Sequence, residues 1–142
     1  MYLGVALCDM TTFVLATNSV HTSAVLCDYL DDRLGEGDAV HAVNSHRGGD
    51  DTSAEDIRDG EDALNAVASR LSGVADVETH QFVREQSPAE DVLEYADEVD
   101  ADEIVIGIRK RNPTSKVVFG SVAQDILLHS NRPMAVVPRE QV

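Results

Sequence analysis

The amino-acid sequence predicts one α/β domain, an open, twisted, five-stranded parallel sheet with helices on both faces. Its 142 residues suit a single domain with a substantial core. Short apolar runs alternate with longer amphipathic segments, which is typical of strands connected by helices. Apolar residues make up 43% of the chain and aromatic residues only 4%, so aliphatic side chains must fill the interior.

The first elements follow this alternation. Residues 12–17 form a compact, β-branched run that predicts a buried strand. A helical pattern then runs from about Thr22 to Leu34 and ends at Gly35. Residues 38–44 predict the second strand.

The middle of the chain repeats the pattern. Residues 45–52 are rich in Gly and Asp and predict an exposed loop. A second helix begins at Ser53 and ends at Gly73, and residues 74–84 predict the third strand. Ser87 predicts the start of a third helix, because Pro88 follows it directly and Glu90 stands three residues after the serine.

The last third of the chain adds two strands and one helix. Residues 103–107 predict the fourth strand, and residues 108–119 a long loop. Ser121 opens the fourth helix, the fifth strand runs from Met134 to Val137, and Pro138 ends that strand.

Strands separated by helices pair in parallel through right-handed crossovers. In such sheets a ligand binds outside the carboxyl ends of the strands, at the point where the strand order reverses. For this chain that rule indicates a site near two residues. Asn18 follows the first strand, and Gly107 ends the fourth.

The charge of the chain bounds its partners. A net charge of −15 repels nucleic acid and anionic lipid, so we expect neither a nucleic-acid nor a membrane partner. Asp outnumbers Glu, and Lys110 and Lys116 are the only lysines, which is typical of a halophilic, salt-adapted protein; an ordinary acidic protein is the alternative. The acidic runs at residues 28–32 and 90–103 predict solvated helix faces.

The chain shows no export or membrane signal, so we expect a cytoplasmic protein. Residues 1–10 are apolar but lack the basic start and cleavage site of a signal peptide; they form an extra strand or an extension before a start at Met10. The domain itself covers residues 11–139. Cys8 and Cys27 fit no metal motif or disulfide framework and are expected to be reduced.

The segment 107–121, GIRKRNPTSKVVFGS, carries the chemistry. It leaves a strand and enters a helix at Gly120 and Ser121, where unpaired N–H groups and the helix dipole favour an anion. Both lysines of the chain lie in this segment, together with Arg109. The alternative is a basic loop that only pairs with acidic neighbours.

Together with the order of strands and helices over about residues 11–138, this segment resembles the universal stress protein family. The family signature is Gly, two residues, Gly, nine residues, Gly and then Ser or Thr, and Gly107, Gly120 and Ser121 fit it. The resemblance implies an adenine nucleotide alpha hydrolase-like, Rossmann-like fold that in one branch of the family holds ATP, with Mg²⁺ accompanying it. The candidate nucleotide-binding residues are Gly107, Arg109, Lys110, Gly120, Ser121, Val122, Asn18 and Val43.

By this resemblance Gly107, Gly120 and Ser121 would face the phosphates, with Asn18 near the ribose and Val43 near the adenine. Lys110 replaces the second signature glycine. If that position requires a positive φ, a lysine costs about 1–2 kcal/mol there, which its ammonium could offset by pairing with a phosphate. Asn18 replaces an acidic residue, and its amide oxygen can still accept from a ribose hydroxyl.

The resemblance therefore implies a small stress-response regulator, not an enzyme, that binds ATP or another adenine nucleotide without turnover. It also implies a homodimer that pairs through the last strand, from Met134 to Val137. The alternative is a nucleotide-independent, homodimeric protein-interaction module of the same fold, and an adenylyl-transferring or flavoprotein relative is a third hypothesis.

No other motif predicts catalysis or a metal site. Three serines are predicted to cap helices, and none lies in a nucleophile elbow: Ser23, Ser53 and Ser87. The five histidines show no metal-ligand spacing such as HxxxH: His21, His41, His46, His80 and His129.

Overall fold

The computed structural model describes residues 10–47, 52–84, 86–110, 117–118 and 120–140. Residues 1–9, and with them Cys8, lie outside this part of the chain. Parallel strands and helices alternate as the sequence predicts. In chain order the elements are β1 (Thr12–Ala16), α2 (Val20–Asp31), β2 (Ala39–Arg47), α3 (Ala54–Leu71), β3 (Asp76–Arg84), α4 (Pro88–Glu98), β4 (Glu103–Lys110), β5 (Val117–Val118), α5 (Ser121–His129) and β6 (Met134–Glu140).

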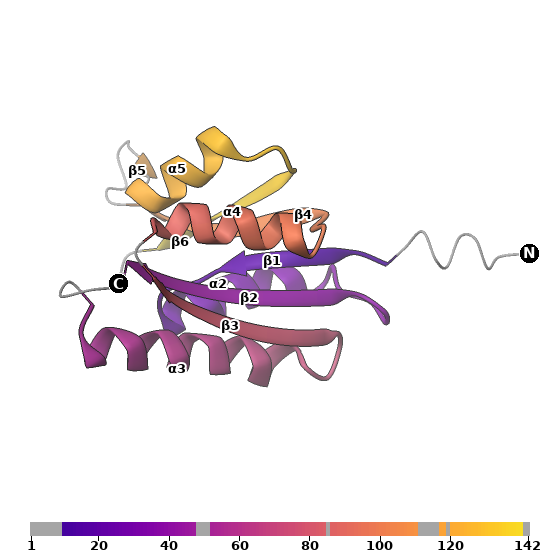
Figure 1. Ribbon diagram of the computed structural model, residues 1–142. Helices are drawn as coiled ribbons and strands as arrows, with labels where there is room; N and C mark the ends of the chain where they lie inside the picture. Colours follow the sequence, from indigo (N-terminus) through magenta and orange to yellow (C-terminus); the bar gives the residue numbers. More distant parts are fainter. Residues whose placement is uncertain (1–9, 48–51, 85, 111–116, 119, 141–142) are drawn as a thin grey trace, which may run out of the picture.

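The sheet confirms the predicted fold class. Its parallel strands lie in the order β3-β2-β1-β4-β6 (Figure 1). The short strand β5 pairs antiparallel with the last two residues of β4. The chain adds β2 and β3 on one side of β1 and then returns to place β4 on the other side, so the strand order reverses between β1 and β4.

Helices cover both faces of the sheet, and alternate residues of each strand supply the two cores. Phe13 and Leu15 of β1 pack with α2 and α3, whereas Val14 packs with α4 and α5. Figure 1 shows α4 and α5 on one side of the sheet and α2 and α3 on the other. The side chains point this way because successive residues of a strand project to opposite faces. Each fully buried aliphatic side chain contributes about 1.5–3 kcal/mol to folding.

Serine caps start three of the helices. Ser53 and Ser87 are the predicted caps, and their hydroxyls accept from the backbone N–H groups of Asp56 and Glu90. The prediction for Ser23 was wrong, because Ser19 caps α2 and Ser23 lies inside that helix. Ser23 is fully buried, and its hydroxyl donates to the Ala63 carbonyl oxygen of α3 at 2.7 Å.

Three strands extend beyond their predicted ends, because backbone pairing does not depend on side-chain polarity. Residues 45–47, predicted as loop, continue β2 and pair with β3 as far as Arg47 opposite Arg84. Residues 108–110, also predicted as loop, belong to β4. Pro138 does not end β6, which pairs with β4 up to Glu140. A proline fits an edge strand because its missing N–H can face the unpaired side.

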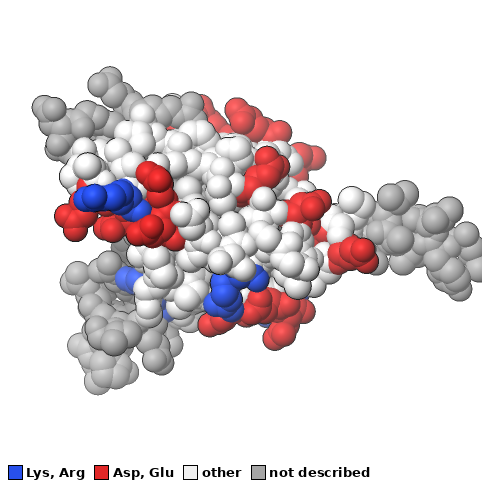
Figure 2. Space-filling model, turned by 90° about the horizontal axis from the view of Figure 1, so that it is seen from below, with Lys and Arg blue, Asp and Glu red and all other residues white. Residues whose placement is uncertain are grey.

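Surface charges are arranged in ion-paired groups. Arg70 of α3 binds Asp28 and Asp31 of α2 at 2.8 and 3.0 Å and so links the two helices on that face. Figure 2 shows acidic side chains spread over one face of the molecule, with basic groups beside them. One predicted acidic face was wrong in part, because Asp91 is fully buried and accepts hydrogen bonds from Ser45 and Gln86.

A buried polar contact joins α3 to the strands. Asn44 is fully buried, donates to the Thr17 carbonyl oxygen at 2.9 Å and accepts from Gln81 at 3.1 Å. Gly60 of α3 lies directly over this pair, and a Cβ there would overlap the Asn44 amide and come within 2.6 Å of the Gln81 nitrogen. The helix therefore requires glycine at this point to pack closely on the sheet.

Gly60→Ala is expected to lower the free energy of unfolding by about 1–2 kcal/mol, although alanine favours the helix by about 1 kcal/mol over glycine. The loss arises because the new methyl group must displace the buried amides. Gly73→Ala is the matched control, since a Cβ there meets nothing within 4 Å. Urea unfolding of both variants measures the effect; equal stability of the two would contradict the packing argument.

Candidate functional site

A cavity of about 640 Å³ lies at the carboxyl edge of the sheet, where the strand order reverses between β1 and β4. Asn18 follows β1 and Gly107 lies in β4, and both residues line this cavity. The first residues of α5 form another part of its wall. This is the place at which open α/β sheets bind ligands.

The N-terminus of α5 opens into the cavity. Gly120 is its N-cap and makes no side-chain cap hydrogen bond, and the next three residues also line the cavity. The first backbone bond of the helix runs from the Gln124 N–H to the Gly120 carbonyl oxygen. The N–H groups before Gln124 have no partner within an α-helix and carry the positive end of its dipole, which favours an anion.

A chain of hydrogen bonds along the cavity wall connects β6 to the residue after β1. The Arg139 guanidinium donates to the Thr22 hydroxyl at 3.3 Å, and that hydroxyl donates to the Asn18 amide oxygen at 3.1 Å. Gly107 lies beside this chain, and a Cβ on it would stand 3.3 Å from the Thr22 methyl group. Because Gly107 has no side chain, α2 can approach β4 closely. The Arg139 guanidinium and the Asn18 amide therefore lie on the same wall of the cavity.

Apolar side chains also line the cavity. Ala16, Val43, Val92 and Ile126 contribute to it, and Val43 and Ile126 are each only 1% exposed. His46 of β2 lines the cavity as well, and its buried Nε2 atom makes no hydrogen bond to the described part of the chain. The cavity therefore combines an anion-attracting helix N-terminus with apolar side chains and one imidazole nitrogen that has no partner among the described residues.

Comparison with known proteins places this architecture in a family. The model of the universal stress protein family matches residues 12–138. The chain belongs to the universal stress protein family. A universal stress protein of Mycolicibacterium smegmatis is 38% identical to it over 88 residues, which are 55% of this chain and 68% of that protein.

Solved structures of the family have the same fold. The universal stress protein from Archaeoglobus fulgidus is 36% identical, with a TM-score of 0.74 over 89% of this chain and 98% of that chain. The structure of the universal stress protein from the same organism in complex with dAMP is 32% identical, with a TM-score of 0.68 over 89% of this chain and 97% of that chain.

Six of the eight candidate residues line the same cavity of this universal stress protein. They come from four separate regions of the chain: Asn18, Val43, Gly107, Gly120, Ser121 and Val122. Ser121 opens α5 as predicted, and Gly120 directly before it is the N-cap.

Arg109 and Lys110 are described by their backbone alone. Lys110 is the last residue of β4, paired with Val117 on one side and Glu140 on the other. Asp100 is the one non-glycine residue with a positive φ in the described ranges, so Lys110 has no left-handed conformation and no associated strain. Residues 111–116 and 119 of the predicted loop lie outside the described residues.

Sequence reasoning placed two cavity residues, His46 and Arg139, outside the strands that carry them. His46 was assigned to a loop, although it belongs to β2, which continues to Arg47. Arg139 was assigned beyond the end of β6, although strand pairing carries β6 past Pro138. Both errors come from ending a strand at polar or proline residues.

The described helices do not include one that could cross a bilayer, since none is both long and apolar enough.

Proposed function

We propose that this universal stress protein binds an adenine nucleotide in the cavity between β1, β4 and α5, without turning it over. The observation that carries the proposal is the uncapped N-terminus of α5, which opens into the cavity beside the reversal of strand order. The complex of the Archaeoglobus fulgidus protein with dAMP supports the choice of ligand.

The polar and apolar lining residues of the cavity suit the phosphate and the base of a nucleotide, respectively. The phosphate would accept from the backbone N–H groups of Ser121 and Val122, with Gly120 leaving room for it. Asn18 would reach the ribose hydroxyls, and Val43 would form the floor under the base. The buried His46 Nε2 atom offers the base a polar contact.

The cationic groups would set the number of phosphates. Arg139 lies on the cavity wall, and Arg109 and Lys110 end the strand that leads to it. Longer phosphate chains bring Mg²⁺ with them, and Asp56 on the cavity rim could share its coordination. Binding without turnover is the proposal because these groups hold and neutralise a phosphate, and none of them is an activated nucleophile.

Gly120→Asp is expected to weaken AMP and ATP binding about tenfold or more, because it puts a carboxylate where the phosphate would lie. The same carboxylate caps α5, so the unliganded variant should be more stable by about 1 kcal/mol. Among the described residues no atom lies within 4 Å of a Cβ at Gly120, so the substitution clashes with none of them. Calorimetric titration and thermal unfolding measure the two effects.

Gly73→Asp is the charge-matched control, since it adds the same carboxylate at an open position outside the cavity lining. Wild type should gain roughly 2.7 kcal/mol of stability at a hundredfold excess of nucleotide over Kd. Unchanged affinity in Gly120→Asp would refute the α5 site. No stabilisation by AMP, ADP or ATP would instead favour the nucleotide-independent interaction module.

We also propose that two chains pair through β6 as a homodimer. In the described part of the sheet β6 pairs only with β4, so its other edge offers unpaired backbone groups. A two-fold axis beside this edge would bring two β6 strands together and remove both edges.

Light scattering is expected to give twice the monomer mass, and hydrogen exchange should show slow amides in Met134–Glu140 that become fast on dilution to the monomer. Pairing across the edge protects these amides, whereas a monomer leaves the outer ones open to water. A monomer at every concentration, or a dimer whose β6 amides exchange freely, would exclude this interface.

A further inference from the structure

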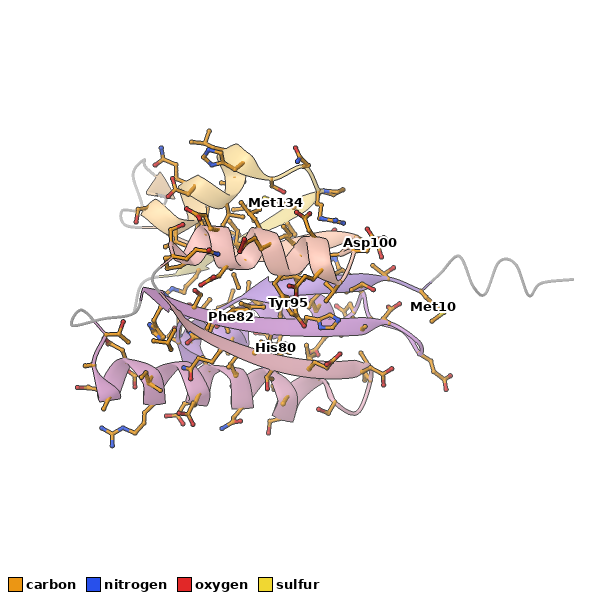
Figure 3. All side chains as sticks on the ribbon, in the orientation of Figure 1. Met10, His80, Phe82, Tyr95, Asp100 and Met134 are labelled. Carbon is orange, nitrogen blue, oxygen red and sulfur yellow. The ribbon has the colours of Figure 1, made fainter. Side chains whose placement is uncertain are left out.

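A second group of functional side chains lies on β2 and β3, apart from the cavity. His41 of β2 stands opposite Glu78 of β3, and His80 follows two residues after Glu78 on the same strand. Residues two apart on a strand project to the same face, so the three side chains share the face that α4 covers. Figure 3 shows His80 of β3 close to Tyr95 of α4.

The three side chains bring their ligand atoms together. One nitrogen or oxygen from each lies within 4.8 Å of those of the other two. His41 Nδ1 is 3.7 Å from Glu78 Oε2, and His80 Nε2 is 3.9 Å from Glu78 Oε1. In a tetrahedral zinc site the ligand atoms are roughly 3.4 Å apart, so small side-chain rotations would close this group around an ion.

One of these ligand atoms lacks a partner of its own. His80 Nε2 is buried and makes no hydrogen bond to the part of the chain that the structure describes. His41 is 8% exposed, and its Nδ1 shares a hydrogen bond of 2.9 Å with the Tyr95 hydroxyl. Burying an imidazole nitrogen without a partner costs free energy, and a bound ion would remove that cost at His80.

The surroundings favour a cation and allow it to enter. The Glu78 side chain is 65% exposed, so this edge of the group is open to solvent. A surface hollow beside it is lined by Tyr95 together with three acidic residues of α4, Glu94, Asp97 and Glu98. Carboxylates around an opening raise the local concentration of cations.

We propose that His41, Glu78 and His80 bind one divalent transition-metal ion, with Zn²⁺ the best match. Two imidazoles and one carboxylate are a ligand set that proteins use for Zn²⁺ and related ions, with a fourth position left to water. Such an ion would tie the edge strand β3 to β2. Sequence spacing misses this site because its ligands come from neighbouring strands, 37 residues apart along the chain for His41 and Glu78.

The site is tested on the full chain, free of nucleotide, with Zn²⁺ by calorimetry and with Co²⁺ by its visible absorption. Wild type should bind one ion per chain and unfold at a higher temperature with Zn²⁺ present. His80→Gln and Glu78→Gln should each weaken Zn²⁺ binding about tenfold or more. Even the loss of a group that only hydrogen-bonds to a metal ligand lowers metal affinity by about that factor. Both side chains are partly or largely exposed, so these variants should fold.

His21→Gln is the control, because it removes an exposed histidine far from this group in sequence. It should bind Zn²⁺ as wild type does, and so should Gly120→Asp, which separates this site from the nucleotide cavity. Absence of Zn²⁺ or Co²⁺ binding to wild type would overturn the proposal. Undiminished binding in both His80→Gln and Glu78→Gln would overturn it as well.

Discussion

The reversal of strand order between β1 and β4 is the constraint on which the rest of the molecule depends. Two neighbouring parallel strands send their chains to opposite faces at this point, so no helix covers the gap between their carboxyl ends. The cavity fills that gap. Around the cavity lie the uncapped start of α5 and the hydrogen bonds that connect Asn18, Thr22 and Arg139. These groups meet there because they lie at or just beyond the carboxyl ends of neighbouring strands.

Buried polar contacts behind the cavity keep its walls in register. Ser23 joins α2 to the carbonyl oxygen of Ala63 in α3, and Asn44 joins β2 to the end of β1. Burying these polar groups costs free energy unless their hydrogen bonds are made. Because few other arrangements make those bonds, the contacts fix the distance between the helices and the sheet. Gly60 and Gly107 serve the same end by letting α3 and α2 approach the strands.

The order of elements and most of the site could be predicted from local patterns. Strand and helix periodicities differ, serines at Ser53 and Ser87 signal helix starts, and parallel topology then brings Asn18 and Gly107 together. The strand ends could not be predicted this way. His46 and Arg139 are polar, and only pairing with a neighbouring strand keeps their backbone extended.

The cluster of His41, Glu78 and His80 escaped prediction for a related reason. Its members are neighbours through the register of β2 and β3, which no local spacing in the sequence encodes. The buried Asp91 belongs to the same class, since its partner Ser45 lies on another element. Side chains that meet across strands or between a strand and a helix become visible only when the register is known.

The central claim is that the open N-terminus of α5 holds the phosphate of a nucleotide. Amide chemical shifts of ¹⁵N-labelled protein, titrated with AMP and in parallel with adenosine, test it most directly. We expect AMP to move the amides of Ser121, Val122 and Ala123 strongly, and adenosine to leave them nearly unchanged while both ligands shift residues near Val43. AMP binding that leaves these three amides in place would contradict the account.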